Sequence, residues 1–212
     1  MRCARDARQL LATLLLGCAA CSSASTRDSS AHVEARERLR SAMELARQEL
    51  HDGAAAELRR YLEIVPDDPQ AHFQLGRSLL QIARRDRGST ASAIDELRRA
   101  LSLAPVSTPI RLQLAEALAE PASGGDPREE VLGLYEAVIA RETDNYEARL
   151  LCARWLLSLG GPADLARARR HLEATADGAP GPWRDQALAL LEGKPAPQGA
   201  ADARKSAYGT AR

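Results

Sequence analysis

Apolar residues recur along most of this chain at the three- and four-residue spacing of amphipathic helices. Segments of about 12 to 15 residues with this period are separated by short stretches rich in Gly, Pro, Asp and Asn, which favour turns. The sequence has no period-two alternation of the kind that a half-buried strand would show. The pattern therefore predicts an all-α protein of paired helices, with turns at 51–53, 66–69, 87–89, 104–105, 121–127, 142–145, 160–162 and 178–182.

The predicted helices repeat one another. Residues 93–105 end in Leu-Ala-Pro, and their apolar offsets recur one unit earlier at Ala54, Leu58, Tyr61, Leu62 and Pro66. A Leu-Gly pair, Leu75-Gly76, lies in the preceding first helix, and one small residue takes the same place in four successive units: Ala42, Gly76, Ala115 and Ala153. This pattern resembles the tetratricopeptide repeat, in which paired helices approach too closely at that position for a larger side chain.

The resemblance implies a right-handed solenoid of about four helix pairs, at 35–68, 69–105, 108–145 and 146–180, with a capping helix from Trp183 to Leu191. The later units exceed the usual repeat length, and their surplus residues are expected inside the turns at 85–90, 121–127 and 160–164, where insertions are tolerated. Val131 replaces the second-helix Ala of the repeat and Thr143 replaces its closing Pro. The second helix of the fourth unit is polar.

In tetratricopeptide proteins the first helices form a concave surface that holds an extended or helical partner segment. Arginine suits a carboxylate there because its guanidinium offers a planar fork of donors. A row of solvated arginines in an Arg-rich chain is the alternative interpretation. The positions that the resemblance assigns to this surface are Arg40, Arg47, Phe73, Gln74, Arg77, Gln81, Gln113, Glu116, Leu150, Arg154 and Ser158.

The N-terminal segment has the charge and hydropathy order of a secretory signal: Arg2, Arg5 and Arg8 precede an apolar run over 10–16. The run is too short to span a bilayer, which needs about 20 apolar residues. Residues 15–18, Leu-Leu-Gly-Cys, resemble the lipobox of bacterial lipoproteins, which implies cleavage before Cys18 and its acylation. Cys21 is a competing acceptor, and an ordinary cleaved signal with an incidental cysteine is the alternative.

These features predict a domain organisation of a signal peptide at 1–17, a lipidated cysteine with a flexible tether at 18–33, a solenoid at 34–192 and a disordered tail at 193–212. The tail has a potential short helix at 200–205. In the resemblance, an Asp after the acylated cysteine retains a lipoprotein in the inner membrane. This chain has Ala19 there, which favours the periplasmic face of the outer membrane.

Charge and chemistry exclude several classes of function. The formal net charge is +0 and becomes slightly acidic without the signal, so we expect no nucleic-acid partner. No glycine-rich phosphate loop follows a strand, and His32, His51, His72 and His171 share no metal-ligand spacing, so we expect no cofactor and no metal. The acidic pairs 67–68, 95–96 and 129–130 are expected to be solvated or to cap helices. Cys152, in an apolar helix, is expected to be a buried inert thiol, with a Cys21 to Cys152 bridge as the alternative.

The sequence thus predicts a membrane-anchored adaptor or assembly factor, without enzymatic activity, that binds a protein or peptide in its concave surface and the bilayer through Cys18. Tetratricopeptide lipoproteins that assist pilus or secretion machinery are similar. Two alternatives remain open at this point: a cell-envelope enzyme or its noncatalytic subunit, and a passive structural spacer.

Overall fold

A computed structural model describes residues 30–88, 90–120 and 126–194, and these residues form helices joined by short turns. The first helix covers 30–47. The others are α2 (His51–Ile64), α3 (Pro69–Asp86), α4 (Ala91–Leu103), α5 (Thr108–Ala119), α6 (Arg128–Arg141), α7 (Tyr146–Leu159), α8 (Pro162–Gly178) and α9 (Gly181–Leu191). The described residues contain no strand, which confirms the all-α prediction.

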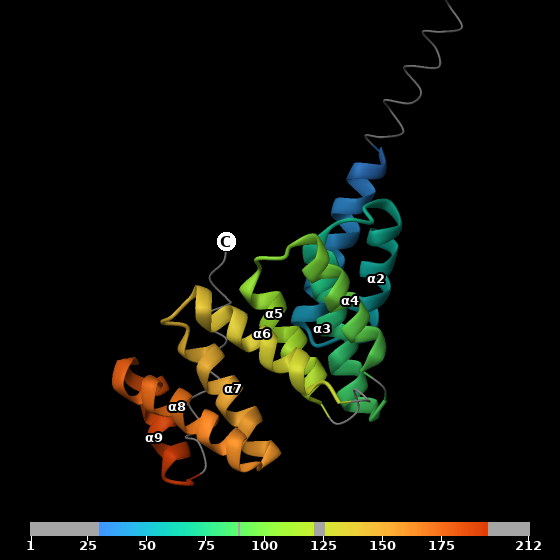
Figure 1. Ribbon diagram of the computed structural model, residues 1–212. Coiled ribbons are helices and arrows are strands. Elements are labelled where there is room, and N and C mark those ends of the chain that lie inside the picture. Colours follow the sequence, from blue (N-terminus) through green and yellow to red (C-terminus); the bar gives the residue numbers. More distant parts are fainter. Residues whose placement is uncertain (1–29, 89, 121–125, 195–212) are drawn as a thin grey trace, which may run out of the picture.

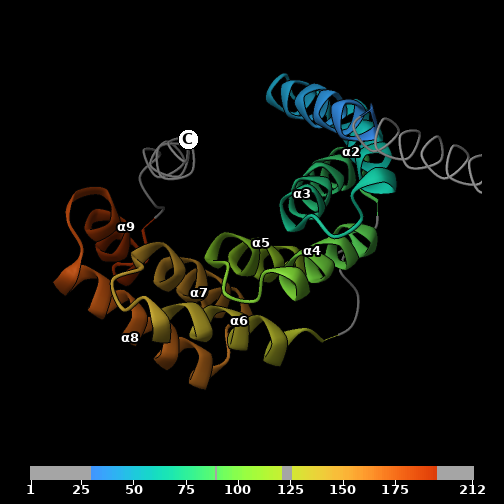
Figure 2. The same ribbon diagram turned by 90° about the horizontal axis from the view of Figure 1, so that it is seen from above.

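Consecutive helices pack into pairs, and the pairs stack into a curved row (Figure 1). The pairs are 30–47 with α2, α3 with α4, α5 with α6, and α7 with α8, and α9 packs on α8 at the end of the row. Seen from above, the first helix of each pair lies on the inner side of the arc and the second helix on the outer side (Figure 2). The prediction of about four pairs and a capping helix is confirmed.

The small-residue position of each unit lies where its helices meet. Ala42, Ala115 and Ala153 are fully buried there. Gly76 is buried too, and a β-carbon on it would come within 2.7 Å of Leu97 Cγ. In the second pair even a methyl group is therefore larger than the space between α3 and α4.

Side-chain caps and prolines start several helices as the sequence chemistry requires. Asp68 Oδ1 accepts from the backbone N–H groups of residues 70 and 71 at the start of α3, and the Asn145 side chain accepts from Ala148 N–H at the start of α7. Proline occupies the first turn of α3, α5, α8 and α9, where its missing N–H costs no helical hydrogen bond. These caps fix the ends of the first helices that line the inner side of the arc.

The buried apolar side chains form two clusters, one in the N-terminal helices and one in the rest of the solenoid. The smaller cluster joins the helix 30–47, α2 and the start of α3 around Leu58 and Leu75. The larger cluster runs from the end of α3 to α9 and includes Leu97, Tyr135 and Leu172. Val131, the departure from the repeat in α6, is fully buried in it, so the larger side chain is accommodated.

Two boundaries differ from the sequence-based expectation. Residues 30–33, assigned above to the tether, already belong to the first helix. The turn that follows them is supported by an ion pair between Glu34 and Arg38, and extending a formed helix by a few residues costs little. The surplus of the fourth unit does not lie in a loop at 160–164. Gly160, at φ 70°, and Gly161 alone form the turn, Pro162 starts α8, and α8 is lengthened to 17 residues.

The second unit shows the same effect, since α3 continues to Asp86 and ends on Arg87 in the left-handed region, at φ 51°. The expected insertion at 121–127 lies largely outside the described residues, as do the signal peptide, Cys18, most of the tether and nearly all of the tail. In the part that is described, none of the helices is long and apolar enough to cross a membrane.

Candidate functional site

The exposed side of α3 carries the best-defined group of side chains on the inner side of the arc. Its core side is occupied by residues such as Leu75 and Leu80, which leaves Gln74, Arg77 and Gln81 on the opposite stripe at helical spacing. Phe73 is partly buried against the core beside this stripe. An apolar ring, an amide and a cation therefore share one surface.

Arg77 is held in place by its neighbours on the same helix. Its guanidinium carbon lies 5.7 Å from the centre of the Phe73 ring, and Nη1 donates to Gln74 Oε1 at 3.4 Å. One side of the guanidinium faces solvent, yet the packed side loses enough water that desolvation lowers the pKa of Arg77. The other N–H donors of the guanidinium have no partner among the described residues.

The other predicted residues lie on the neighbouring first helices. Gln113 and Glu116 are half-buried on α5, and Arg154 and Ser158 are exposed on α7. Arg154 has no partner among the residues that the structure describes. We call the six residues Phe73, Gln74, Arg77, Gln113, Glu116 and Arg154 the inner row.

Other predicted residues lie outside these six. Arg40 and Arg47 are exposed on the helix 30–47, and Arg47 is engaged by Glu44 at 2.8 Å, one turn away. Leu150 was assigned to the concave surface, and that assignment is wrong: it is 3% exposed and belongs to the core. The helix-to-surface mapping fails at this position because α7 has to bury Leu150 together with Cys152 and Ala153.

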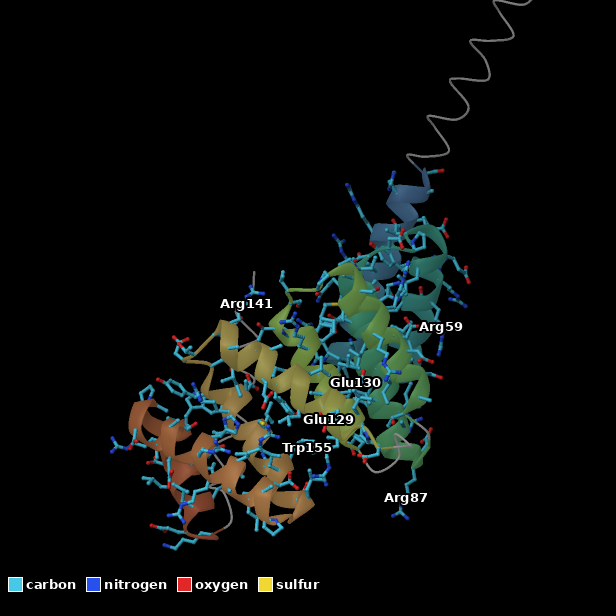
Figure 3. The ribbon with its side chains drawn as sticks, in the orientation of Figure 1. Arg59, Arg87, Glu129, Glu130, Arg141 and Trp155 are labelled. Atoms are coloured by element: carbon cyan, nitrogen blue, oxygen red, sulfur yellow. The ribbon has the colours of Figure 1, made fainter. Side chains whose placement is uncertain are left out.

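At least one member of each acidic pair makes a contact of its own. Asp68 caps α3, whereas the neighbouring Asp67 pairs with Arg99 at 2.5 Å. Glu96 Oε2 lies 2.7 Å from His72 Nδ1, which joins α4 to α3. At the start of α6, Glu130 accepts from Arg98 of α4 at 2.8 Å, beside Glu129 (Figure 3). Of these contacts, Glu96 with His72 joins the two helices of one pair, and Glu130 with Arg98 joins two successive pairs.

Cys152 offers no exposed thiol for chemistry. Cys152 is fully buried, and burial, followed by the charge of Glu136, raises the pKa of its thiol to about 12. Across 30–88, 90–120 and 126–194, no three His, Cys, Asp or Glu side chains come together as metal ligands would.

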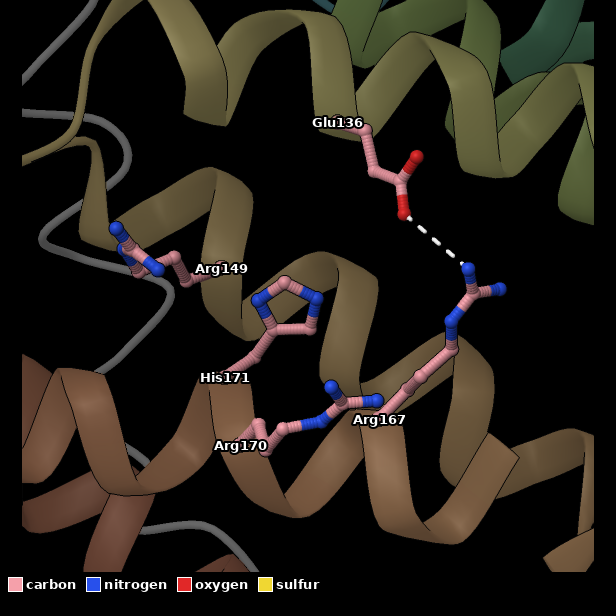
Figure 4. Close-up of a pocket in the computed structure, with 5 residues that line it drawn as sticks. All are labelled: Glu136, Arg149, Arg167, Arg170 and His171. Carbon is pink, nitrogen blue, oxygen red and sulfur yellow. Dashed lines mark ion pairs between the residues drawn. The ribbon is translucent and has the colours of Figure 1, made fainter. Parts of the chain in front are cut away.

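A second cluster, which the sequence reasoning missed, lines an open pocket of about 340 Å³ between α6, α7 and α8. Its residues are Glu136, Arg149, Arg167, Arg170 and His171. Figure 4 shows Arg167 pointing toward Glu136, the His171 ring between Arg149 and Arg167, and the guanidinium of Arg149 pointing away from the other four. We call this the basic pocket. The spacing of residues 167, 170 and 171 places them on one side of α8, and this could have been seen in the sequence. Glu136 of α6 and Arg149 of α7 come close to them only when the helices pack.

Comparison with known proteins gives a likeness in structure but not in sequence. No family model and no curated protein matches the chain. Among solved structures, it is similar to one described as the crystal structure of MamA protein, with a TM-score of 0.59, 17% identity, and coverage of 84% of this chain and 97% of that chain.

The fold is a tetratricopeptide-type α-solenoid. At such low identity the likeness concerns the fold alone, so functional arguments have to come from this chain's own side chains. The inner row lies on the first helices, whereas the basic pocket lies between the second helices α6 and α8 and the start of α7, and the two sites share no residue.

Proposed function

We propose that this protein is a membrane-anchored adaptor whose inner row binds a protein or peptide segment. The observation that carries the proposal is the stacking of Arg77 on Phe73 beside Gln74, on a helix that lines the inner side of the arc. Because Phe73 and Gln74 already restrain Arg77, binding of a carboxylate to its remaining N–H donors costs little further entropy of the Arg77 side chain.

The composition of the inner row favours a segment with both acidic and amide groups. Arg77 and Arg154 provide cations on α3 and α7, and Gln113 on α5 between them offers a donor and an acceptor. Amphipathic or extended segments bind such surfaces through a few anchors spaced along their length. A partner segment that crosses α3, α5 and α7 would contact all three first helices at once.

The proposed anchor is an acylated Cys18 at the periplasmic face of the outer membrane. Each buried methylene of an acyl chain contributes about 0.8 kcal/mol, so several chains together hold a protein almost permanently. The short segment between Cys18 and the first helix at residue 30 would hold the solenoid at a typical distance of roughly 20 Å from the bilayer. Confinement raises the local concentration of the inner row around partners in the same membrane.

Charge reversal tests whether the inner row binds a partner. The variant Arg77→Glu with Arg154→Glu reverses two cations of the row. The control reverses Arg59 and Arg87, which are exposed on α2 and just beyond α3 and point away from the body of the solenoid (Figure 3). In-cell cross-linking with mass spectrometry should show a partner for the wild type and the control, and a loss of that partner for the inner-row variant.

The result also separates the alternative functions. Unchanged cross-links in the inner-row variant would overturn the adaptor and favour a passive spacer. Hydrolysis of cell-wall material by the purified protein, abolished by a single acidic substitution, would favour an envelope enzyme instead. The separate structural contacts of Asp68, Glu96 and Glu130 support the noncatalytic interpretation.

A further inference from the structure

The basic pocket has an unusual balance of charge for this protein. It brings together three guanidinium groups and one carboxylate, a net charge of +2 while the imidazole of His171 is neutral. Elsewhere arginines on successive repeats meet carboxylates closely, as Arg98 meets Glu130 at 2.8 Å and Arg128 meets Asp164 at 2.8 Å. Like charges held together in a partly desolvated site repel one another unless an anion joins them.

The carboxylate in the pocket does not neutralise its neighbours. Glu136 Oε1 lies 3.8 Å from Arg167 Nη2, the longest ion pair among the described residues, and this is the dashed contact in Figure 4. Arg170 has no partner in the described part of the chain. Arg149 donates Nε and Nη2 to the Thr143 carbonyl at 3.2 and 2.9 Å, which fixes its position and leaves its third nitrogen available.

We propose that the basic pocket binds an oxyanion of the phosphate type, either inorganic phosphate or the phosphate group of a monoester. Two charges match the pocket's net charge, and a tetrahedral anion presents oxygens in several directions, so that it can meet Arg167 and Arg170 of α8 beside the His171 ring. The pocket lies apart from the inner row, so this site is independent of the proposed adaptor function.

His171 makes the binding pH-dependent. Burial first, and then the charge of Arg149, lowers the pKa of His171; Glu136 opposes this shift, and Arg170 and Arg167 add to it. These are the charged groups that α6, α7 and α8 place around the ring. A bound anion favours the protonated ring, so affinity should increase as the pH falls toward and below the pKa of His171.

Calorimetric titration of the full-length protein with sodium phosphate, at constant ionic strength, tests the site. Arg170→Gln should weaken binding about tenfold, the loss of one charge-assisted interaction. Arg169→Gln is the matched control, because Arg169 is adjacent, pairs outward with Glu173 at 2.8 Å and does not line the pocket. Glu136→Gln removes the competing carboxylate and should tighten binding.

Parallel titrations identify the source of the anion. Tighter binding of glycerol phosphate than of inorganic phosphate would assign an organic phosphate, and equal binding would assign the free anion. Sulfate, which stays doubly charged, should bind more tightly at pH 5.5 than at pH 7.5, and His171→Gln should remove that difference. The proposal is overturned if phosphate does not saturate the wild type, if acetate binds as tightly, or if Arg169→Gln weakens binding as much as Arg170→Gln.

Discussion

A β-carbon on Gly76 would lie 2.7 Å from Cγ of Leu97, the fully buried leucine of the facing helix. It would also lie 3.1 Å from the carbonyl oxygen of Ala93. Neither neighbour is the free end of a flexible side chain, so α3 and α4 meet here with no space for a methyl group. The position that the repeat reserves for a small residue is at its tightest in the second unit.

The same chemical change at two helical glycines should therefore have opposite effects. Gly76→Ala should lower the free energy of unfolding by about 1 to 3 kcal/mol, the usual cost of overpacking. Gly133→Ala should raise it by about 0.5 to 1 kcal/mol, because a β-carbon on Gly133 meets nothing within 4 Å and alanine favours the helix. Urea unfolding of both variants measures the difference, and stabilisation by Gly76→Ala would contradict the packing described.

Tyr61 should make stability fall at high pH. It is 7% exposed and donates to Asp68 Oδ2 at 2.6 Å. Burial, followed by the hydrogen bond and charge of Asp68, raises its pKa to about 12. An unfolded tyrosine has a pKa of about 10, so the stabilisation is complete below pH 10 and is lost as the pH rises to 12, roughly 2 to 3 kcal/mol in total.

Urea unfolding at pH 9 and pH 11.5 measures this loss. Cys152 adds a decrease of the same sign, so the effect of Tyr61 is the difference between the wild type and Tyr61→Phe, which should have the shallower pH dependence. Parallel curves for the wild type and Tyr61→Phe would be inconsistent with the shifted pKa.

Cys152 should be unreactive in the folded protein. Its side chain is fully buried and its thiol pKa is raised to about 12, so the thiolate that attacks thiol reagents is scarce at pH 8. Replacing Cys3, Cys18 and Cys21 with Ser in the full chain leaves one thiol. Absorbance with a disulfide reagent should stay near zero until denaturant is added. Rapid reaction without denaturant would show that Cys152 is accessible.

The sequence predicted those parts of the fold that depend on local spacing. The small residues at Ala42, Gly76, Ala115 and Ala153, and the cap at Asp68, have physical requirements that can be seen in one segment at a time. The surplus residues before Thr90 and after Gly160 were expected in turns, but they lengthen α3 and α8 instead. The sequence does not separate the two cases, because a helix can be lengthened as readily as a loop when no side chain stops it. Leu150 was misplaced because its burial depends on neighbouring helices.

The inner row was predicted by residue type, and the structure adds the stacking of Arg77 on Phe73. The basic pocket could not be predicted in the same way. Glu136, Arg149 and Arg167 are far apart in sequence and are brought together by the packing of α6, α7 and α8. Neighbouring positively charged residues, such as those on α8, are also common on helices that face only solvent, so their spacing alone does not indicate a pocket.

Lipidation should depend on Cys18 alone. Cys18→Ser should release the protein from membranes and abolish its labelling by a fatty-acid analogue, since the thiol that accepts the acyl chain is gone. Cys21→Ser is the matched control and should leave both unchanged. Membrane fractionation and labelling of growing cells measure the two effects. Labelling that persists in Cys18→Ser, or that disappears only with Cys21→Ser, would contradict the proposed anchor.

Site-specific photo-cross-linking in cells shows most directly whether the inner row binds a protein partner. A photoreactive residue at Gln113 lies on a first helix, and the same residue at Ala137 lies on the exposed side of α6, a second helix. We expect a discrete protein adduct from position 113 that is lost when Arg77→Glu is added, and none from position 137. Equal adducts from both positions, or an adduct from position 113 that Arg77→Glu leaves unchanged, would contradict it.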